Sequence, residues 1–173
     1  MIPVSGTGRK AARVIGTIGL LCILCFPLLR TPAAAGEAGV PGPSARDKCP
    51  VCGMFVSKYP DWTAVVLFRD GSRVYFDGAK DMFKYLFDMK RYDPRRDPGS
   101  IRSILVTDYY RITWTDARKA WYVLGSDVYG PMGRELIPLE KETDAREFLN
   151  DHKGKRILRF PGITREVVLG LDE

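Results

Sequence analysis

Two sulfur donors separated by one glycine, Cys52-Gly53-Met54, are the residues with the clearest capacity for chemistry. In an extended segment, side chains two residues apart point to the same side, so both sulfurs can reach one ion. Gly53 lets the backbone bend around that ion. Thiolate and thioether are soft donors that favour Cu(I). The spacing therefore predicts a Cu(I) site that uses Cys52 and Met54.

Two further candidate ligands, Met132 and His152, lie far along the chain. Met132 stands in Gly130-Pro131-Met132-Gly133, a loop setting that differs from that of a core methionine. The alternative role for Met132 is to fill space in the loop. His152 is the only histidine, and it follows a predicted helix, where a histidine also interacts with the last carbonyl groups. Both residues are predicted as candidate ligands beside these structural alternatives.

Cys49 forms a Cys-Pro-Val-Cys motif with Cys52, and this motif is compatible with several chemistries. Cys49 is a further candidate metal ligand, but the two thiols could also form a disulfide in an oxidising compartment. The alternative function is therefore that of a thiol-disulfide protein. Enzymes of that kind usually place the motif at the start of a helix, which lowers the thiol pKa, whereas here a strand is expected to follow. A closed zinc site would need a carboxylate or a second chain, because zinc prefers four ligands.

The first 35 residues have the pattern of a secretory signal peptide. Basic residues at 9, 10 and 13 precede an apolar run over 14–29, and an Ala-x-Ala cleavage site follows at Ala33 and Ala35. We therefore expect a periplasmic or envelope-associated protein, in which an uncleaved N-terminus would instead act as a membrane anchor. Without this segment, 23 basic and 21 acidic side chains remain. Nucleic acid is therefore not an expected partner, since its binding needs a clustered basic excess.

The mature part predicts an α+β fold made of two similar ββαβ units. Residues 36–47 are rich in Gly, Pro, Ala and Ser, which is typical of a flexible leader. The first unit is expected over 48–110 and the second over 111–173, because both halves show the order strand, turn, strand, helix, strand. Each unit is small, so we expect the two to pack together and share a core. The expected elements are strands at 63–68, 73–76, 101–107, 120–124, 135–139 and 156–160, and helices at 78–89 and from 143 or 144 to about 152.

The acidic residues around the first predicted helix have a plain structural interpretation. Asp77 precedes the helix and is predicted to cap it, and Asp70 and Asp81 are interpreted as further turn and cap residues. Thr143 or Asp144 is expected to cap the second helix. One histidine and no serine in a nucleophile-elbow setting argue against a hydrolase, and we expect no enzymatic activity.

Several motifs resemble, in the same order, those of the NosL family, accessory copper proteins of nitrous-oxide reductase maturation. They are Cys49-Pro50-Val51-Cys52-Gly53-Met54-Phe55-Val56 leading into Tyr59-Pro60, Tyr75-Phe76-Asp77, Gly130-Pro131-Met132-Gly133-Arg134-Glu135, and Ala145 to Phe148 followed by His152. The resemblance covers roughly residues 48–162. The sequence departs from the family in lacking a lipidation motif, and Arg134 stands where a histidine would have been a convenient extra ligand.

The resemblance implies a pair of ββαβ units, export from the cytoplasm and Cu(I) as the bound ion. It places Cys52 and Met54 at the matching ligand positions and supports Met132 and His152 as further candidates. The implied partner is a copper-receiving enzyme or assembly complex, with the nitrous-oxide reductase machinery as the suspected client.

Overall fold

The computed structural model describes residues 39–173. The signal segment expected over 1–35 lies outside the described residues, as does the start of the leader. Within residues 39–173, every helix is too short or too polar to span a bilayer. The described end of the leader is held in place, because Tyr75 Oη donates to Pro41 O at 2.7 Å and Trp114 Nε1 donates to Val40 O at 3.1 Å. Val40 and Pro41, in the segment expected to be flexible, therefore contact residues of the first sheet.

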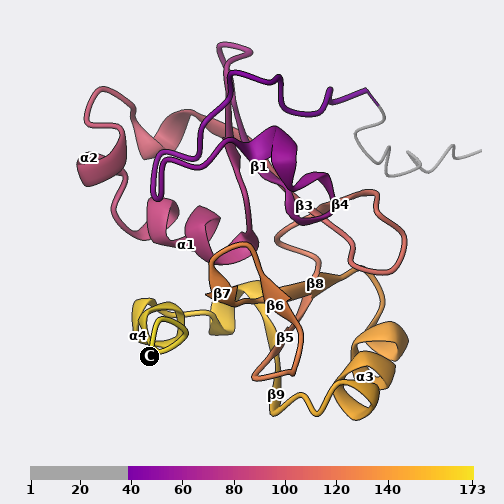
Figure 1. The fold of residues 1–173 in the computed structure, drawn as a ribbon. Helices are drawn as coiled ribbons and strands as arrows, with labels where there is room; N and C mark the ends of the chain where they lie inside the picture. Colours follow the sequence, from indigo (N-terminus) through magenta and orange to yellow (C-terminus); the bar gives the residue numbers. More distant parts are fainter. Residues whose placement is uncertain (1–38) are drawn as a thin grey trace, which may run out of the picture. The chain divides into compact units, whose positions relative to one another are not determined.

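The first unit is a four-stranded antiparallel sheet with a helical connection (Figure 1). Its strand order is β2-β1-β3-β4, with the all-buried strand β1 between β2 and β3. The turn at Asp70-Gly71 joins β1 to β2, as the hairpin pattern predicts. The elements are β1 (Ala64–Phe68), β2 (Arg73–Phe76), α1 (Ala79–Phe87), α2 (Met89–Tyr92), β3 (Ile101–Thr107) and β4 (Trp114–Asp116).

The second unit repeats the plan of the first. Its three strands run in the order β8-β5-β9, which matches β2-β1-β3 when each strand is replaced by its counterpart. A short hairpin, β6–β7, is inserted between β5 and β8 and has no equivalent in the first unit. The elements are β5 (Trp121–Leu124), β6 (Tyr129–Gly130), β7 (Gly133–Arg134), β8 (Ile137–Leu139), α3 (Glu142–Asp151) and β9 (Arg156–Arg159). The predicted α+β class with two ββαβ units is confirmed.

Some elements differ from the expected boundaries. Strand β4 follows residue 110 and yet pairs with β3, so the first sheet extends past the expected boundary between the units. The helix expected over 78–89 is interrupted at Asp88 and continues as α2. The short elements that carry no strong periodicity are the 3-10 helices Val56–Lys58, Pro60–Trp62, Pro98–Ser100 and Phe160–Gly162, and the C-terminal helix α4 (Arg165–Leu169).

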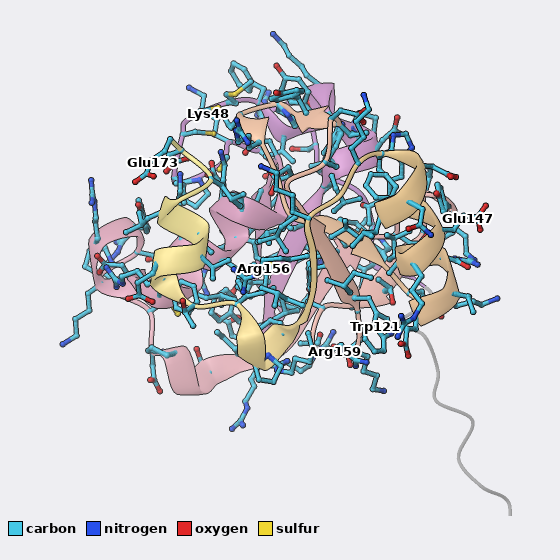
Figure 2. The ribbon with its side chains drawn as sticks, turned by 90° about the horizontal axis from the view of Figure 1, so that it is seen from below. Lys48, Trp121, Glu147, Arg156, Arg159 and Glu173 are labelled. Atoms are coloured by element: carbon cyan, nitrogen blue, oxygen red, sulfur yellow. The ribbon has the colours of Figure 1, made fainter. Side chains whose placement is uncertain are left out.

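The two units share one core, as their small size requires. Phe83 of α1 packs edge-on against Tyr122 of β5, with ring centroids 5.5 Å apart, and also contacts Phe160 at 5.0 Å. A smaller apolar cluster around Phe148 lies beneath α3. Between β9 and the central strand β5 of the second sheet, the Arg159 guanidinium lies 4.2 Å from the centroid of the Trp121 ring (Figure 2). The position of α1 is therefore fixed from both units.

The prediction that Asp77 caps α1 is wrong. The N-cap residue is Gly78, and no side chain of its own segment caps the helix. Glu135, from the second unit, takes this role instead: its Oε1 accepts hydrogen bonds from Lys80 N at 2.5 Å and Leu136 N at 2.9 Å. The expected cap of α3 is also wrong, because the helix begins earlier, at Glu142, after the N-cap residue Lys141.

The buried position of Glu135 makes stability depend on pH. Burial raises the pKa of Glu135 to about 8, against the lowering effect of the two backbone N–H donors. Between its ordinary pKa and this raised value, the folded chain binds a proton that the unfolded chain has lost, so stability falls as pH rises through this window. We expect Glu135→Gln to remove this loss, which is at most about 1.4 kcal/mol per pH unit. Urea unfolding at pH 5, 6, 7 and 8 gives the free energy of unfolding of both proteins. If this free energy depended on pH in the same way in both, the assignment would be contradicted.

Candidate metal site

A tight loop over residues 47–56 brings the two cysteines to the same side. Cys49 N donates to Met54 O at 2.9 Å, and Gly53 N donates back to Cys49 O at 2.8 Å. The reversal between these bonds requires Gly53, whose φ of 80° lies in the left-handed region that favours glycine. Val56 N then closes the loop on Asp47 O at 3.0 Å. The glycine in the sequence motif therefore shapes the loop that carries the thiols.

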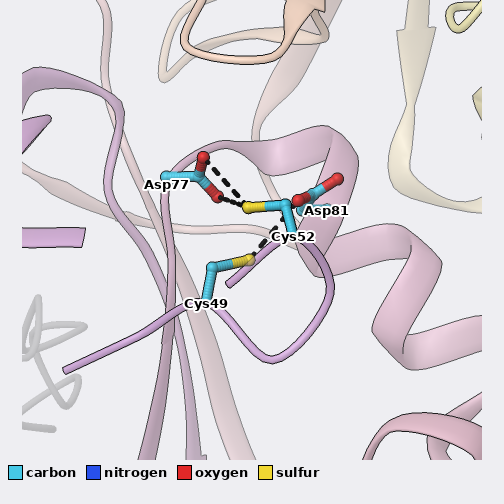
Figure 3. A group of neighbouring side chains, drawn as sticks. All are labelled: Cys49, Cys52, Asp77 and Asp81. Carbon is cyan, nitrogen blue, oxygen red and sulfur yellow. Dashed lines mark hydrogen bonds between the residues drawn. The ribbon is translucent and has the colours of Figure 1, made fainter. Parts of the chain in front are cut away.

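The carboxylates of Asp77 and Asp81 face these thiols from the start of α1 (Figure 3). Asp77 directly follows β2, and Asp81 lies four residues later, one helical turn along. Cys52 Sγ donates to both oxygens of Asp77, at 3.3 and 3.4 Å, and Cys49 Sγ donates to Asp81 Oδ2 at 3.4 Å. One ligand atom from each of the four residues lies within 4.8 Å of the others. These four residues could hold a metal ion.

Burial keeps both thiols protonated while no metal is bound. Cys49 is 1% exposed and Cys52 is half-buried. Burial raises the pKa of Cys52 to about 12 and that of Cys49 still further, and the nearby carboxylate charge of Asp81 adds to both effects. A thiol-disulfide enzyme needs the opposite, a thiolate stabilised by its surroundings. In the metal-free protein both cysteines are therefore thiols, and a metal that binds them would displace their protons.

Sequence reasoning missed the two carboxylates, because it treated Asp77 and Asp81 as turn and cap residues. Both are buried, at 1% and 2% exposure, although charged side chains are almost never fully buried without partners. The available signal was their spacing of four residues at the start of an apolar helix, close after the cysteine loop in the sequence. These aspartates also supply the carboxylates that a closed four-ligand site would need in a chain with few cysteines.

Met132 shares a cavity with two members of this group. It lines a cavity of about 430 Å³ together with Cys52 and Asp81, and it is 42% exposed. The apolar wall of the cavity comes from Val51, Phe87, Tyr92, Val168 and Leu169. Met54 is half-buried in the cysteine loop. The structure therefore places Cys49, Cys52 and Met54 on one loop and Met132 at the cavity that Cys52 also lines.

His152 lies elsewhere, at the C-terminal end of α3. Its Nδ1 is 3.3 Å from Asp127 Oδ1, and its ring stacks on Phe148 with centroids 4.3 Å apart. Figure 2 shows Glu147 of α3 at the right edge of the molecule, whereas Lys48, which leads into the cysteine loop, lies near the top. Among the described residues, the group of possible ligands around the cysteines does not include His152. Packing under α3 accounts for its position.

The arrangement can be compared with that of known proteins. The NosL family model matches residues 42–168, which is well over half of the chain. The chain belongs to the NosL family. This membership confirms the resemblance that the ordered motifs indicate.

Two relatives extend the comparison. The NosL chain is 27% identical over 130 residues to a protein of Stutzerimonas stutzeri described as "Copper-binding lipoprotein NosL", a match that covers 70% of this chain but only 64% of the relative. A crystal structure of the copper chaperone NosL from Shewanella denitrificans shares the fold, with a TM-score of 0.62 and 23% identity. That match covers 74% of this chain and 97% of the other.

The different burial of the two thiols predicts an order of chemical modification. We expect iodoacetamide to alkylate Cys52 before Cys49 in the folded, metal-free protein, because only Cys52 lines the open cavity. Both should react far more slowly at pH 8 than a free thiol, since the thiolate is the nucleophile. Both cysteines lie in the tryptic peptide 49–58, so fragmentation of that peptide by tandem mass spectrometry assigns each label and measures the two rates. In urea the rates should converge. Faster labelling of Cys49 in the folded protein would show that the loop has a different conformation.

Proposed function

We propose that this NosL protein is an exported metallochaperone that binds one Cu(I) ion and passes it to a copper enzyme. The observation that carries the proposal is that two thiols of one loop belong to a group of possible ligands, while Met132 lines the cavity that Cys52 also lines. Soft sulfur donors favour Cu(I) over harder cations. The printed descriptions of the two relatives, a copper-binding lipoprotein and a copper chaperone, agree with this choice of metal.

The proposed ligand set is Cys49, Cys52 and Met132, with Met54 as the donor that the cysteine loop could add. Binding replaces two S–H bonds by two Cu–S bonds, so two protons leave as one Cu(I) enters. The carboxylates of Asp77 and Asp81 already accept hydrogen bonds from the two thiols. They are therefore placed to receive these protons at the moment the metal displaces them. Copper is the cargo, and no organic substrate is transformed.

Release is proposed to occur by ligand exchange at the open side of the site. Met132 and Cys52 line the cavity, whereas Cys49 is buried. An acceptor that enters the cavity meets the thioether first, which is a weaker donor than a thiolate. It would replace Met132, then Cys52, and Cys49 would be the last ligand to leave. Each step keeps the ion bound to sulfur, so free copper is not released.

The proposed acceptor is a copper-receiving enzyme or assembly complex outside the cytoplasm. Family membership favours the nitrous-oxide reductase machinery, and the signal pattern at residues 1–35 favours a periplasmic or envelope location. The alternative, a thiol-disulfide protein that uses Cys49 and Cys52, has less support, because burial raises rather than lowers both thiol pKa values.

The ligand assignment is tested by Cu(I) titration of the reduced protein without oxygen, in competition with a chromogenic Cu(I) chelator. We expect one tightly bound Cu(I) per chain, and Cys52→Ser should abolish this binding because it removes one thiolate from the site. His152→Ala is the matched control and should bind as the unmodified protein does, since His152 packs beneath α3.

Three results would contradict the proposal. Full affinity in Cys52→Ser would exclude the cysteine loop as the site. Lost affinity in a folded His152→Ala protein would place the copper elsewhere. Tighter binding of Zn²⁺ than of Cu(I) would show that the carboxylates, rather than the sulfurs, select the ion.

Proton displacement predicts a steep dependence of copper affinity on pH. Since both thiols are protonated at neutral pH, affinity should rise about tenfold per pH unit for every thiolate that forms. A slope near two decades per pH unit between pH 6 and 8 supports binding by both cysteines. If a carboxylate keeps one of the displaced protons, the slope is near one decade, and Asp77→Asn or Asp81→Asn should then steepen it. An affinity that does not change with pH would contradict thiolate binding.

A further inference from the structure

Lys80 is a buried lysine on α1 that contacts two of the segments bordering the cavity. It is 1% exposed. Its Nζ donates to Met132 O at 2.7 Å and forms an ion pair with Asp172 Oδ1 at 3.0 Å, near the C-terminus. Its backbone N–H donates to Glu135 Oε1. A single residue therefore links the helix that carries Asp81 to the hairpin that carries Met132.

Burying an ammonium group is costly unless it is paired and hydrogen-bonded. Asp172 supplies the opposite charge to Lys80, and the Met132 carbonyl supplies an acceptor. Removing the side chain would leave both groups without this partner. The contact is therefore specific and directional, and it fixes the backbone of Met132 at the residue whose side chain lines the cavity.

The hairpin that holds Met132 has little structure of its own. Strands β6 and β7 are two residues each, far fewer than an independent hairpin needs for stability. Glu135, just after the hairpin, caps α1, and the absence of a side chain at Gly78 makes room for its carboxylate. Gly130 also leaves room, since a Cβ there would lie 3.2 Å from the Glu135 side chain. Lys80 and Glu135 thus dock this hairpin onto α1.

We propose that Lys80 is a positioning residue that, with Glu135, holds the thioether of Met132 over Cys52 and so supplies the third sulfur of the copper site. This inference rests on the proposed function. Without the docked hairpin, the site keeps two thiols and two carboxylates, a set that suits divalent ions such as Zn²⁺ as well. The third sulfur shifts the preference toward soft, monovalent copper. Lys80 thus sets metal specificity without touching the metal.

A double-mutant cycle tests this coupling. Met132→Leu, Lys80→Leu and the double variant are compared with the unmodified protein for Cu(I) affinity. We expect each single change to weaken binding about 10- to 100-fold, in the range observed when residues that orient metal ligands are removed. The double variant should be little weaker than either single one, because both remove the same donor. X-ray absorption should count one fewer sulfur neighbour in all three variants, which a general loss of stability would not produce.

Two controls separate positioning from stability. Leu139→Ala opens a void in the other apolar cluster and lowers the melting temperature, yet should keep affinity and sulfur count. Lys119→Leu removes a lysine whose side chain is 72% exposed and should change neither. If Lys80→Leu does not fold, Lys80→Gln takes its place, because the shorter amide would lie out of hydrogen-bond reach of Met132 O and the same loss of one sulfur neighbour is expected. The Cu(I)-induced shift of the ¹³C-labelled Met132 methyl group reports that loss.

The outcomes distinguish this inference from the proposed function. Failure of the unmodified protein to bind Cu(I) would contradict both the proposed function and the role of Lys80. Copper binding with additive effects in the cycle, or with an unchanged sulfur count in folded Lys80→Leu or Lys80→Gln, would overturn the role of Lys80 alone. An unchanged sulfur count in Met132→Leu would do the same, because no thioether would then need positioning.

Discussion

The pairing of two thiols with two carboxylates at the start of α1 is the interaction on which the rest of the site depends. Asp77 and Asp81 are buried, and charged groups remain in such positions only when hydrogen bonds or opposite charges compensate for the lost water. The thiols of Cys52 and Cys49 supply the hydrogen bonds, and Lys84 Nζ, 3.6 Å from Asp81, supplies charge. The cysteine loop and the helix start therefore stabilise each other before any metal arrives.

The two ββαβ units repeat one fold but contribute unequally to the candidate metal site. The first unit carries the cysteine loop and both aspartates. Strand β2 leads directly to Asp77, and α1, which begins two residues later, carries Asp81. The second unit repeats the ββαβ order, but its inserted hairpin β6–β7 reaches the site in place of its own helix. Helix α3, the counterpart of α1, carries His152 away from the sulfurs. Glu135 replaces a local cap for α1, so the helix that presents the carboxylates is complete only when both units are folded.

Local patterns account for what could be predicted from the sequence. Alternating and continuous apolar runs gave the strands, because burial decides strand formation, and the run over 101–107 matches β3 at both ends. Cys52 and Met54 were predicted as ligands because sulfur donors are rare and their spacing is short, and the structure places Cys52 in the group of possible ligands. The caps failed for a different reason: Asp77 is a good local cap, but a thiol distant in sequence competes for its carboxylate. Only the tertiary structure, which brings Glu135 to α1, could reveal that exchange.

Charge balance explains why carboxylates accompany sulfurs in a site proposed for a monovalent ion. Replacing two thiol protons by one Cu(I) would leave the buried site one unit more negative, at a large cost in a medium of low dielectric constant. If one displaced proton stays on Asp77 or Asp81, the site keeps the charge it had before binding. When the copper leaves, that proton can return from the carboxyl group to the thiolate that the metal has vacated. The two groups are 3.3 or 3.4 Å apart, the distance of the hydrogen bond between them in the metal-free protein. Loading and release would then require little movement of charge within the protein, which suits a carrier that must give up a tightly held ion.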